Sequence, residues 1–345
     1  MDAAQWYDVQ SWGVEGKGWE QTLAYYDRLP ARAESLVTPA VWRLSRMSAG
    51  LCTYFKTNSR TIRARWRLGQ QELAMPHMPA TGVSGLDLYA RDARGAWRWV
   101  GVGRPERSPD AEATLAQGFD GQERTYLLYL PLYNTVQSLE IGVEAGASFA
   151  GLAPRRARPL VYYGTSIVQG ACASRPGMAH TAILGRRLDV PVINLGFSGN
   201  GDMAMGVAQL MSELDAALFV IDCLPNMTGP QVTERLEPFV KTLRSRTDAP
   251  IVLVEDRTYT NAPFIAAHRE RHAASRAALR AGYERLLAQG YTDLHYVEGD
   301  LLLGDDGEAC VDASHPTDLG FMRLADALEP VLRPLLSRGA DRAGA

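Results

Sequence analysis

The sequence predicts a chain of two domains: an antiparallel β-sandwich, followed by an α/β domain with a parallel sheet. Its 345 residues exceed the ~100–200 residues of one typical domain. Residues 40–150 contain short strands separated by turns, whereas further along the chain apolar runs alternate with amphipathic stretches. Between the two patterns, residues 152–159 hold two prolines, three arginines and no periodicity, which is typical of a linker. We therefore expect domains at 1–153 and 158–336, with a flexible tail at 337–345.

The first domain is predicted from strand-length segments of period two. Residues 62–68 place Ile62, Ala64, Trp66 and Leu68 on one face and arginines on the other, as in a half-buried strand. Similar segments lie at 86–91, 97–102, 125–130 and 139–144. Many short strands with few helical periods between them must pack sheet on sheet, so we expect an antiparallel β-sandwich.

The second domain is predicted from strands that alternate with helices. Apolar runs of buried-strand type lie at 160–163, 190–194, 217–222, 251–255 and 293–297. Helical stretches lie at 179–188, 203–213, 230–247, 262–289 and 317–336. This alternation predicts a parallel sheet covered on both faces. Such sheets bind ligands at the carboxyl ends of their strands, so we expect the functional residues in the loops there.

The composition excludes several classes of function. Hydrophobic residues make up 46% and charged residues 22%, as in a folded protein. The formal net charge of -3 gives no basic excess, so we expect no nucleic-acid partner. The N-terminus lacks the positive charge and apolar run of a signal peptide, and no segment approaches ~20 apolar residues, so we expect a cytoplasmic protein without membrane association. The scattered cysteines (Cys52, Cys172, Cys223 and Cys310) form no C-x-x-C pair, which predicts free thiols and no metal site.

The loop after the first parallel strand offers a nucleophile. Ser166 follows Gly164 and Thr165 where that strand ends, so its hydroxyl would point out of the sheet edge. Its N–H would be placed to donate to an oxyanion. The same segment is equally typical of a plain helix N-cap serine.

The loop after the last parallel strand offers a base. Asp312 precedes His315 by three residues and can reach Nδ1 of the imidazole, which leaves Nε2 for a serine. Taken alone, this segment is more typical of a surface loop that caps the next helix. Its place on the same sheet edge as Ser166, in a chain with six histidines, favours the catalytic interpretation.

Two loops between them offer hydrogen-bond donors for a developing oxyanion. The glycines of residues 194–201 would let a backbone N–H, such as that of Gly199, approach a substrate closely. Asn226, in the loop after the third strand, could direct its side-chain amide to the same point. Each loop alone is also typical of ordinary turns.

Together, the four blocks Ser, Gly, Asn and Asp-x-x-His resemble those of the SGNH (GDSL-like) hydrolase superfamily. The resemblance covers residues 158–335 and implies a flavodoxin-like three-layer α/β/α domain. It implies Ser166 as nucleophile, His315 as base and Asp312 as the partner that orients the base. It also implies an oxyanion hole made by the N–H groups of Ser166 and Gly199 and the amide of Asn226, with no cofactor and no metal.

The first domain carries a second resemblance. Residues 85–89 read Gly-Leu-Asp-Leu-Tyr, similar to the GxDLY signature of a jelly-roll-like β-domain that precedes some bacterial SGNH hydrolases. Carbohydrate acetyl esterases have a similar architecture. The chain departs from the family pattern at Thr165, where Asp is usual, and at Met227, where a second Asp often follows the Asn.

We therefore expect a serine esterase that cleaves short-chain esters, with acetyl as the first choice, on a small molecule or an oligosaccharide. Lysophospholipase, thioesterase or lactonase activity at the same site stays open. So does a carbohydrate-binding module with an inactive hydrolase. An exposed sheet edge in the β-domain would also allow a homo-oligomer.

Some charged residues carry weaker signals. Residues 255–257 (Glu-Asp-Arg) end the fourth strand and are more typical of a solvated turn than of a pocket. His268 and His272 share one face of a charged helix and are expected at the surface. Arg175 could contact substrate or form a structural salt bridge.

Overall fold

The structure is a computed structural model that describes residues 4–300 and 302–342. The chain divides into two compact units. Unit 1 contains the residues up to Ala31, then Ser45–Arg156 and Ala173–Gly177. Unit 2 contains Arg32–Leu44, Ala157–Cys172 and the residues from Met178 onward.

The units differ from the predicted domains by two exchanged segments. The main crossing, between Arg156 and Ala157, falls inside the predicted linker. Arg32–Leu44 lies in the first half of the chain but belongs to unit 2, whereas Ala173–Gly177 lies in the second half but belongs to unit 1. Sequence periodicity is local and carries no signal for such exchanges.

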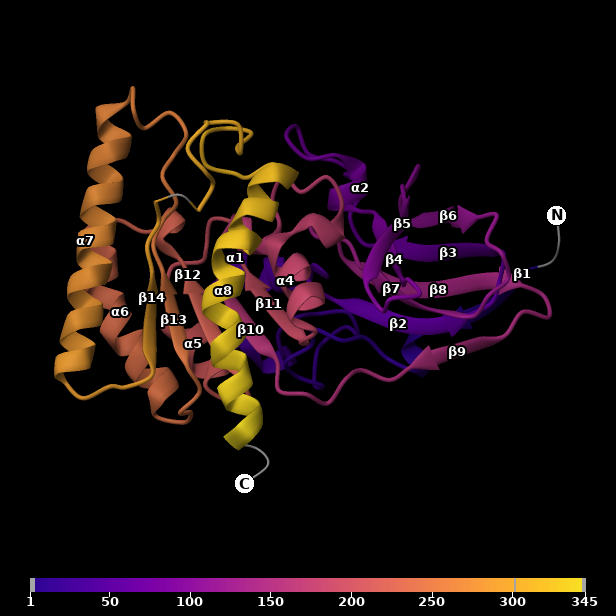
Figure 1. The fold of residues 1–345 in the computed structure, drawn as a ribbon, viewed down its shortest axis with the longest axis horizontal. Helices are drawn as coiled ribbons and strands as arrows, with labels where there is room; N and C mark the ends of the chain where they lie inside the picture. Colours follow the sequence, from indigo (N-terminus) through magenta and orange to yellow (C-terminus); the bar gives the residue numbers. More distant parts are fainter. Residues whose placement is uncertain (1–3, 301, 343–345) are drawn as a thin grey trace. The chain divides into compact units, whose positions relative to one another are not determined.

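Unit 1 is a sandwich of two antiparallel sheets (Figure 1). One sheet has the order β1 (Ala4–Asp8), β8 (Val136–Glu144), β3 (Thr61–Leu68), β6 (Asp110–Gln117). The other has the order β5 (Trp97–Gly103), β4 (Leu86–Arg91), β7 (Arg124–Tyr129), β2 (Cys52–Thr57), β9 (Phe149–Leu152). Apolar side chains of both sheets form one buried cluster. The predicted β-sandwich is confirmed.

Strand β3 shows why this sandwich forms. Its even-numbered residues face the core, where Ile62 and Ala64 are fully buried and Trp66 is 2% exposed. The Trp66 indole N–H donates to the Ser84 carbonyl at 3.1 Å, so the ring is buried with its polar atom satisfied. The arginines point the other way, where Arg65 forms an ion pair with Glu140 on β8.

Unit 2 is built on a parallel sheet of five strands. Their order is β11 (Val192–Gly196), β10 (Leu160–Gly164), β12 (Leu218–Asp222), β13 (Ile251–Val254), β14 (Leu294–Val297). In chain order this is 2-1-3-4-5, the flavodoxin-like arrangement. Strands β10, β12 and β13 are buried along their whole length, which explains their continuous apolar runs.

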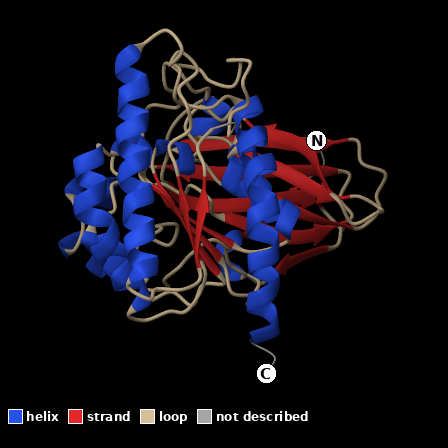
Figure 2. Cartoon of the chain, turned by 60° about the vertical axis from the view of Figure 1, so that its left-hand side comes forward, coloured by secondary structure: helices blue, strands red, loops and turns tan. Residues whose placement is uncertain are grey.

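Helices cover both faces of this sheet, and Figure 2 shows them on either side of the strands. On one face α4 (His180–Leu188) packs against α8 (Asp318–Arg342). On the other, α5 (Met205–Met211), α6 (Gly229–Arg244) and α7 (Ala266–Ala288) pack in succession. The three-layer prediction is confirmed. Helix α8 continues to Arg342, so it occupies much of the predicted tail, and residues 343–345 lie outside the described residues.

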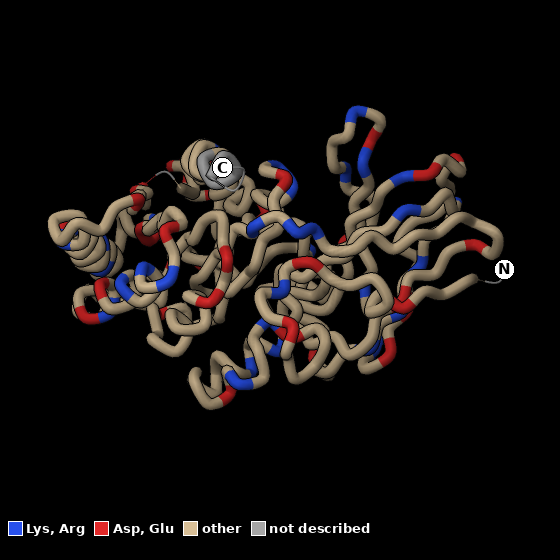
Figure 3. Tube along the Cα trace, turned by 90° about the horizontal axis from the view of Figure 1, so that it is seen from below, with Lys and Arg blue, Asp and Glu red and all other residues tan. Residues whose placement is uncertain are grey.

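The remaining helices are short: α1 (Pro39–Ser45), α2 (Ala80–Val83) and α3 (Ser166–Gln169). No helix in the described part of the chain has the length and apolar character to cross a membrane. Figure 3 shows basic and acidic residues interspersed along the chain, in keeping with the net charge of -3. All four cysteines are free thiols, as predicted.

Candidate active site

Ser166 is the first residue of α3, immediately after β10. The N-cap of this helix is Thr165, whose hydroxyl accepts the Ile167 N–H at 3.3 Å. The interpretation of Ser166 as a plain N-cap is therefore wrong, because Thr165 has that role at the position where the family usually has Asp. The Ser166 side chain instead turns toward His315, and its Oγ lies 2.8 Å from Nε2 of the imidazole.

His315 is held by Asp312 in one tight turn. Its Nδ1 lies 2.8 Å from Asp312 Oδ2, and its backbone N–H donates to Asp312 Oδ1 at 2.8 Å. The Ser314 N–H donates to the same Oδ1 at 3.2 Å. Because Nδ1 carries the proton toward the carboxylate, Nε2 is left as the acceptor for the serine.

The charge on Asp312 is stabilised by these bonds. Partial burial alone would raise the pKa of the Asp312 carboxyl. The hydrogen bonds from His315 and Ser314 outweigh burial and hold that pKa below its usual value. The carboxylate is therefore ionised throughout the neutral range.

The loop after β11 lies against the end of β10. The Phe197 N–H donates to the Gly164 carbonyl at 2.9 Å, and the Ser198 N–H donates to Gln169 Oε1 on α3 at 3.0 Å. Gly199 has a φ of +69° and is exposed, with open space where a side chain would stand. Because Gly199 has no side chain, nothing on this residue covers its backbone N–H.

Asn226 ends the 3₁₀ turn Leu224–Asn226 after β12. The Gly201 N–H donates to its Oδ1 at 3.2 Å, which orients the amide and leaves Nδ2 as the donor group. This hydrogen bond thus joins the loop after β11 to the loop after β12. The oxyanion-hole roles of Ser166, Gly199 and Asn226 stay predictions.

Two predictions about charged residues are wrong. Glu255, Asp256 and Arg257 are buried, with exposures of 7%, 0% and 0%, instead of forming a solvated turn. The Arg257 guanidinium forms an ion pair with Asp222 at 2.7 Å, and the two charges compensate each other inside the unit. His272 is 3% exposed and not a surface residue.

Arg175 forms the structural salt bridge that the sequence left open, within unit 1. Its guanidinium lies 2.8 Å from Asp87, the buried acid of the Gly-Leu-Asp-Leu-Tyr segment. Asp87 also accepts the Gly177 N–H at 2.7 Å and the Trp99 indole N–H at 2.9 Å. The signature aspartate therefore anchors Ala173–Gly177 to strand β4.

Sequence reasoning missed Gln169, which is fully buried and holds the Ser198 N–H. A glutamine inside a four-residue helix carries no pattern that would single it out. Within residues 4–300 and 302–342, no group of three or more His, Cys, Asp or Glu residues is placed to hold a metal ion.

Comparisons with known proteins identify the family of both parts of the chain. Residues 157–333 match the GDSL-like lipase/acylhydrolase family, and residues 4–149 match the N-terminal region of SGNH-hydrolase-type esterases. No curated protein matches the chain. A protein from Bacteroides ovatus described as a GDSL-like lipase has 35% identity and a TM-score of 0.92, covering 97% of this chain and 98% of its own.

More distant structures share the fold. The salicylyl-acyltransferase SsfX3 of a tetracycline biosynthetic pathway has 19% identity and a TM-score of 0.77, covering 96% of this chain and 97% of its own. A family two carbohydrate esterase from Cellvibrio japonicus has 13% identity and a TM-score of 0.60, covering 98% and 99%. Since the family match spans more than half of the chain, the chain belongs to the GDSL-like lipase/acylhydrolase family, with an N-terminal GxDLY domain.

Proposed function

We propose that this protein is a serine esterase in which Ser166, His315 and Asp312 act as a catalytic triad. The observation that carries the proposal is the continuous chain of contacts from Ser166 Oγ to His315 Nε2 and from Nδ1 to Asp312, each 2.8 Å long. This is the geometry that general-base activation of a serine requires.

The reaction proceeds in two steps. His315 Nε2 takes the Ser166 proton as Oγ bonds to the ester carbonyl carbon. The tetrahedral intermediate then collapses, the ester C–O bond breaks, and the imidazolium gives its proton to the leaving alcohol. Water attacks the acyl-enzyme in the same way, with His315 again as base, and releases the acid and free Ser166.

The oxyanion is held by the N–H groups of Ser166 and Gly199 and by Asn226 Nδ2. The bond from the Gly201 N–H to Asn226 Oδ1 supports this role, because it fixes the amide before substrate binds. We expect Asn226→Ala to lower kcat by about 10²–10³, the usual cost of one such donor. An unchanged kcat would remove Asn226 from the oxyanion hole.

The substrate is proposed to be a short-chain ester, with acetyl preferred and a carbohydrate as its alcohol. The support is architectural: the same two-part fold occurs in a family two carbohydrate esterase from Clostridium thermocellum, whose structure was determined with cellohexaose. The absence of a long apolar lid segment in the sequence supports a short acyl group.

The test compares p-nitrophenyl acetate, butyrate and octanoate as substrates of the wild type and of Ser166→Ala. We expect the wild type to turn over acetate fastest and Ser166→Ala to lose nearly all activity, because the triad acts as a unit. A fluorophosphonate should label the wild type and spare the variant. Acetylated xylo-oligosaccharides, followed by acetate release, test the alcohol.

Other outcomes point elsewhere. A rate that peaks at octanoate would favour a lysophospholipase or thioesterase at the same site. Equal background rates for both proteins, with no labelling of Ser166, would overturn the esterase proposal and favour a carbohydrate-binding module.

A further inference from the structure

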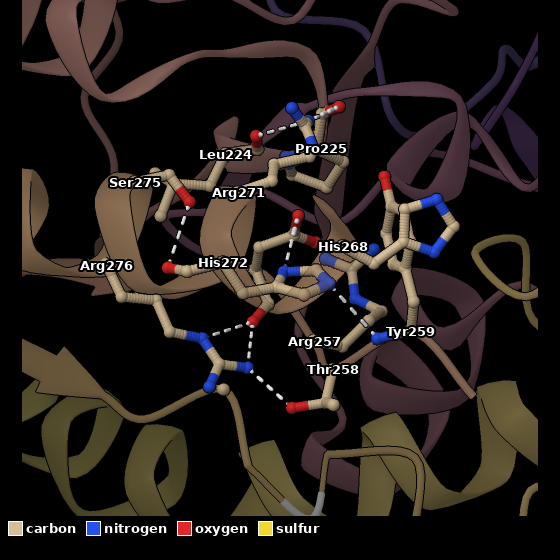
Figure 4. A network of polar contacts seen from close by, with 12 residues as sticks. Leu224, Pro225, Arg257, Thr258, Tyr259, His268, Arg271, His272, Ser275 and Arg276 are labelled. Carbon is tan, nitrogen blue, oxygen red and sulfur yellow. Dashed lines mark hydrogen bonds and ion pairs between the residues drawn. The ribbon is translucent and has the colours of Figure 1, made fainter. Parts of the chain in front are cut away.

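Helix α7 contacts the loop that carries Asn226. The Arg271 guanidinium on this helix donates to the Pro225 carbonyl at 2.6 Å and lies 3.4 Å from the Leu224 carbonyl (Figure 4). Asn226 is the next residue along the chain. Both contacts come from Nη2, whose N–H groups are fixed in the plane of the guanidinium, so the two neighbouring carbonyls are held in one orientation.

The same helix holds the loop after β13 through His272. The His272 Nε2 accepts the Tyr259 N–H at 3.2 Å, so its proton is on Nδ1, which lies 3.4 Å from Asp256 Oδ2. The Tyr259 ring meets the imidazole edge to face, with centroids 4.5 Å apart. The buried imidazole thus holds the Tyr259 backbone to the helix and lies close to the Asp256 carboxylate.

Arg276, one turn further along α7, holds the same loop. Its Nε and Nη2 donate to the Asp256 carbonyl at 3.0 and 2.6 Å, and Nη2 also donates to Thr258 Oγ1 at 2.8 Å. Figure 4 shows Arg271, His272 and Arg276 projecting from neighbouring positions of one helix toward these loops.

The loop after β13 in turn contacts the turn that carries the base. The Thr260 N–H donates to the Ala313 carbonyl at 3.1 Å. Ala313 lies between Asp312 and His315 and has a φ of +72°, a strained conformation for a residue with a side chain. The bond to Thr260 therefore helps to keep the Asp312–His315 turn in place.

From these contacts we propose that Arg271 is a positioning residue, which fixes the Leu224 and Pro225 carbonyls so that the Asn226 amide is held toward the oxyanion. Together with His272 and Arg276, Arg271 makes α7 a common support for the Leu224–Asn226 turn and, through the loop after β13, for the Asp312–His315 turn. The inference rests on the proposed esterase function. Its physical basis is that a long, packed helix moves less than the loops attached to it.

The activity test uses the full chain and the variants Arg271→Ala, Arg271→Lys and Arg285→Ala. Arg285 is the matched control, because it lies on α7 and pairs with Glu237 on α6 at 2.7 Å, away from the loops that Arg271 contacts. We expect Arg271→Ala to lower kcat for p-nitrophenyl acetate by about 10- to 100-fold with little change in KM, since a misplaced donor affects mainly the transition state. Arg271→Lys should recover part of the loss, and Arg285→Ala should keep the wild-type kcat.

A double-mutant cycle shows whether Arg271 acts through Asn226. The variant Asn226→Ala/Arg271→Ala should be no slower than Asn226→Ala alone, because the group being positioned is already absent. Losses that multiply would overturn the proposal. So would a wild-type kcat in Arg271→Ala, or equal losses in Arg271→Ala and Arg285→Ala.

Amide hydrogen exchange separates this inference from the function on which it rests. The Gly201 N–H is bonded to Asn226 Oδ1, so its exchange rate reports on the position of the Asn226 side chain. We expect Arg271→Ala, but not Arg285→Ala, to speed this exchange whether or not an ester is hydrolysed. If Arg271→Ala leaves the exchange rate of the Gly201 N–H unchanged, Arg271 does not position Asn226. If the wild type and Ser166→Ala instead show the same background rate of ester hydrolysis, only the esterase assignment is lost.

Discussion

The Asp312 carboxylate is used twice in the turn that bears His315. One oxygen accepts two backbone N–H groups, and the other faces the imidazole Nδ1. The first set of bonds shapes the turn and the second fixes the tautomer. Because the two oxygens have separate tasks, a substitution that keeps the first and removes the second isolates the catalytic contribution.

Asp312→Asn is such a substitution. Its Oδ1 can still accept the backbone N–H groups, but its NH₂ would donate to Nδ1 and force the proton onto Nε2, where it blocks the serine. We expect kcat to fall by about 10⁴, as for the equivalent change in serine proteases, with a similar melting temperature. Steady-state kinetics on p-nitrophenyl acetate and a thermal melt check this. A loss of less than about tenfold would show that Asp312 does not orient the base.

His180 shows how a single buried residue affects stability. It is fully buried between Tyr162 and Phe321, and its ring nitrogens have no hydrogen-bond partner among the described residues. Burial, reinforced by the charge of Arg257, lowers the pKa of His180 from 6.5 to about 3. The folded protein therefore keeps this imidazole neutral.

This predicts a pH dependence of stability. The folded pKa lies below the unfolded one, so the unfolded chain binds more protons between pH 6.5 and 3, and stability falls as the pH drops through this range. Between pH 7.5 and 5, the linkage relation gives a loss of about 2 kcal/mol from this group. We expect His180→Phe to be spared that loss, measured as the free energy of unfolding in urea at both pH values. If both proteins lose the same amount, His180 is not kept neutral by the fold.

At the scale of elements, the loop after β11 depends on close backbone approach. A Cβ at Gly201 would stand 2.1 Å from the Gly164 carbonyl, whereas a Cβ at Gly199 would meet nothing within 4 Å. Both positions are glycine, but only Gly201 is required by the contact between this loop and the end of β10.

The two alanine substitutions should therefore differ. Gly201→Ala must displace the loop or the strand end, so we expect a loss of about 1–3 kcal/mol in stability and a strong fall in kcat. Gly199→Ala should cost about 1–2 kcal/mol for the left-handed backbone, with a smaller fall in kcat because nothing is displaced. Urea unfolding and kinetics of both variants check this. Equal kcat values would show that the contact at Gly201 does not control the site.

The elements that could be predicted are those whose pattern is set by their own burial. Residues 62–68 alternate because one face of β3 is buried, and the run 217–222 is apolar because β12 is buried on both faces. Residues 255–257 could not be predicted, because their burial depends on partners distant in the chain. Asp222 lies 35 positions from Arg257, and Arg276 lies 20 positions from Asp256.

In the candidate site, too, some residues could be predicted from the sequence and others could not. Ser166, His315 and Asp312 follow the carboxyl ends of predicted strands, so their proximity follows from the order of a parallel sheet. The supports of these loops, Gln169, Arg271 and His272, lie inside helices. Their side chains are selected by contacts that form only in the folded chain, so local patterns do not reveal them.

At the scale of the whole molecule, each unit contains a segment from the other half of the sequence. Within unit 2, Arg32 pairs with Glu213. A Cβ at Gly206, in the first turn of α5, would stand 2.0 Å from the Leu36 carbonyl, so the backbones of Arg32–Leu44 and α5 are in direct contact. A version of unit 2 cut at the linker would lack this segment and expose the surface of α5 that it covers.

We therefore predict that a chain beginning at residue 157 is less stable than one in which residues 32–44 precede residue 157 through a Gly/Ser linker. For a unit of this size, each 1 kcal/mol lost lowers the melting temperature by about 2–4 °C, and we expect a loss of several degrees. Scanning calorimetry of the two chains measures the difference in melting temperature, with Glu213→Ala in the longer chain as an internal check. Since Arg32 and Glu213 form an exposed pair, Glu213→Ala should change little, and the loss should come from uncovering α5. Identical melting curves for the two chains would show that Arg32–Leu44 rests on unit 2 without stabilising it.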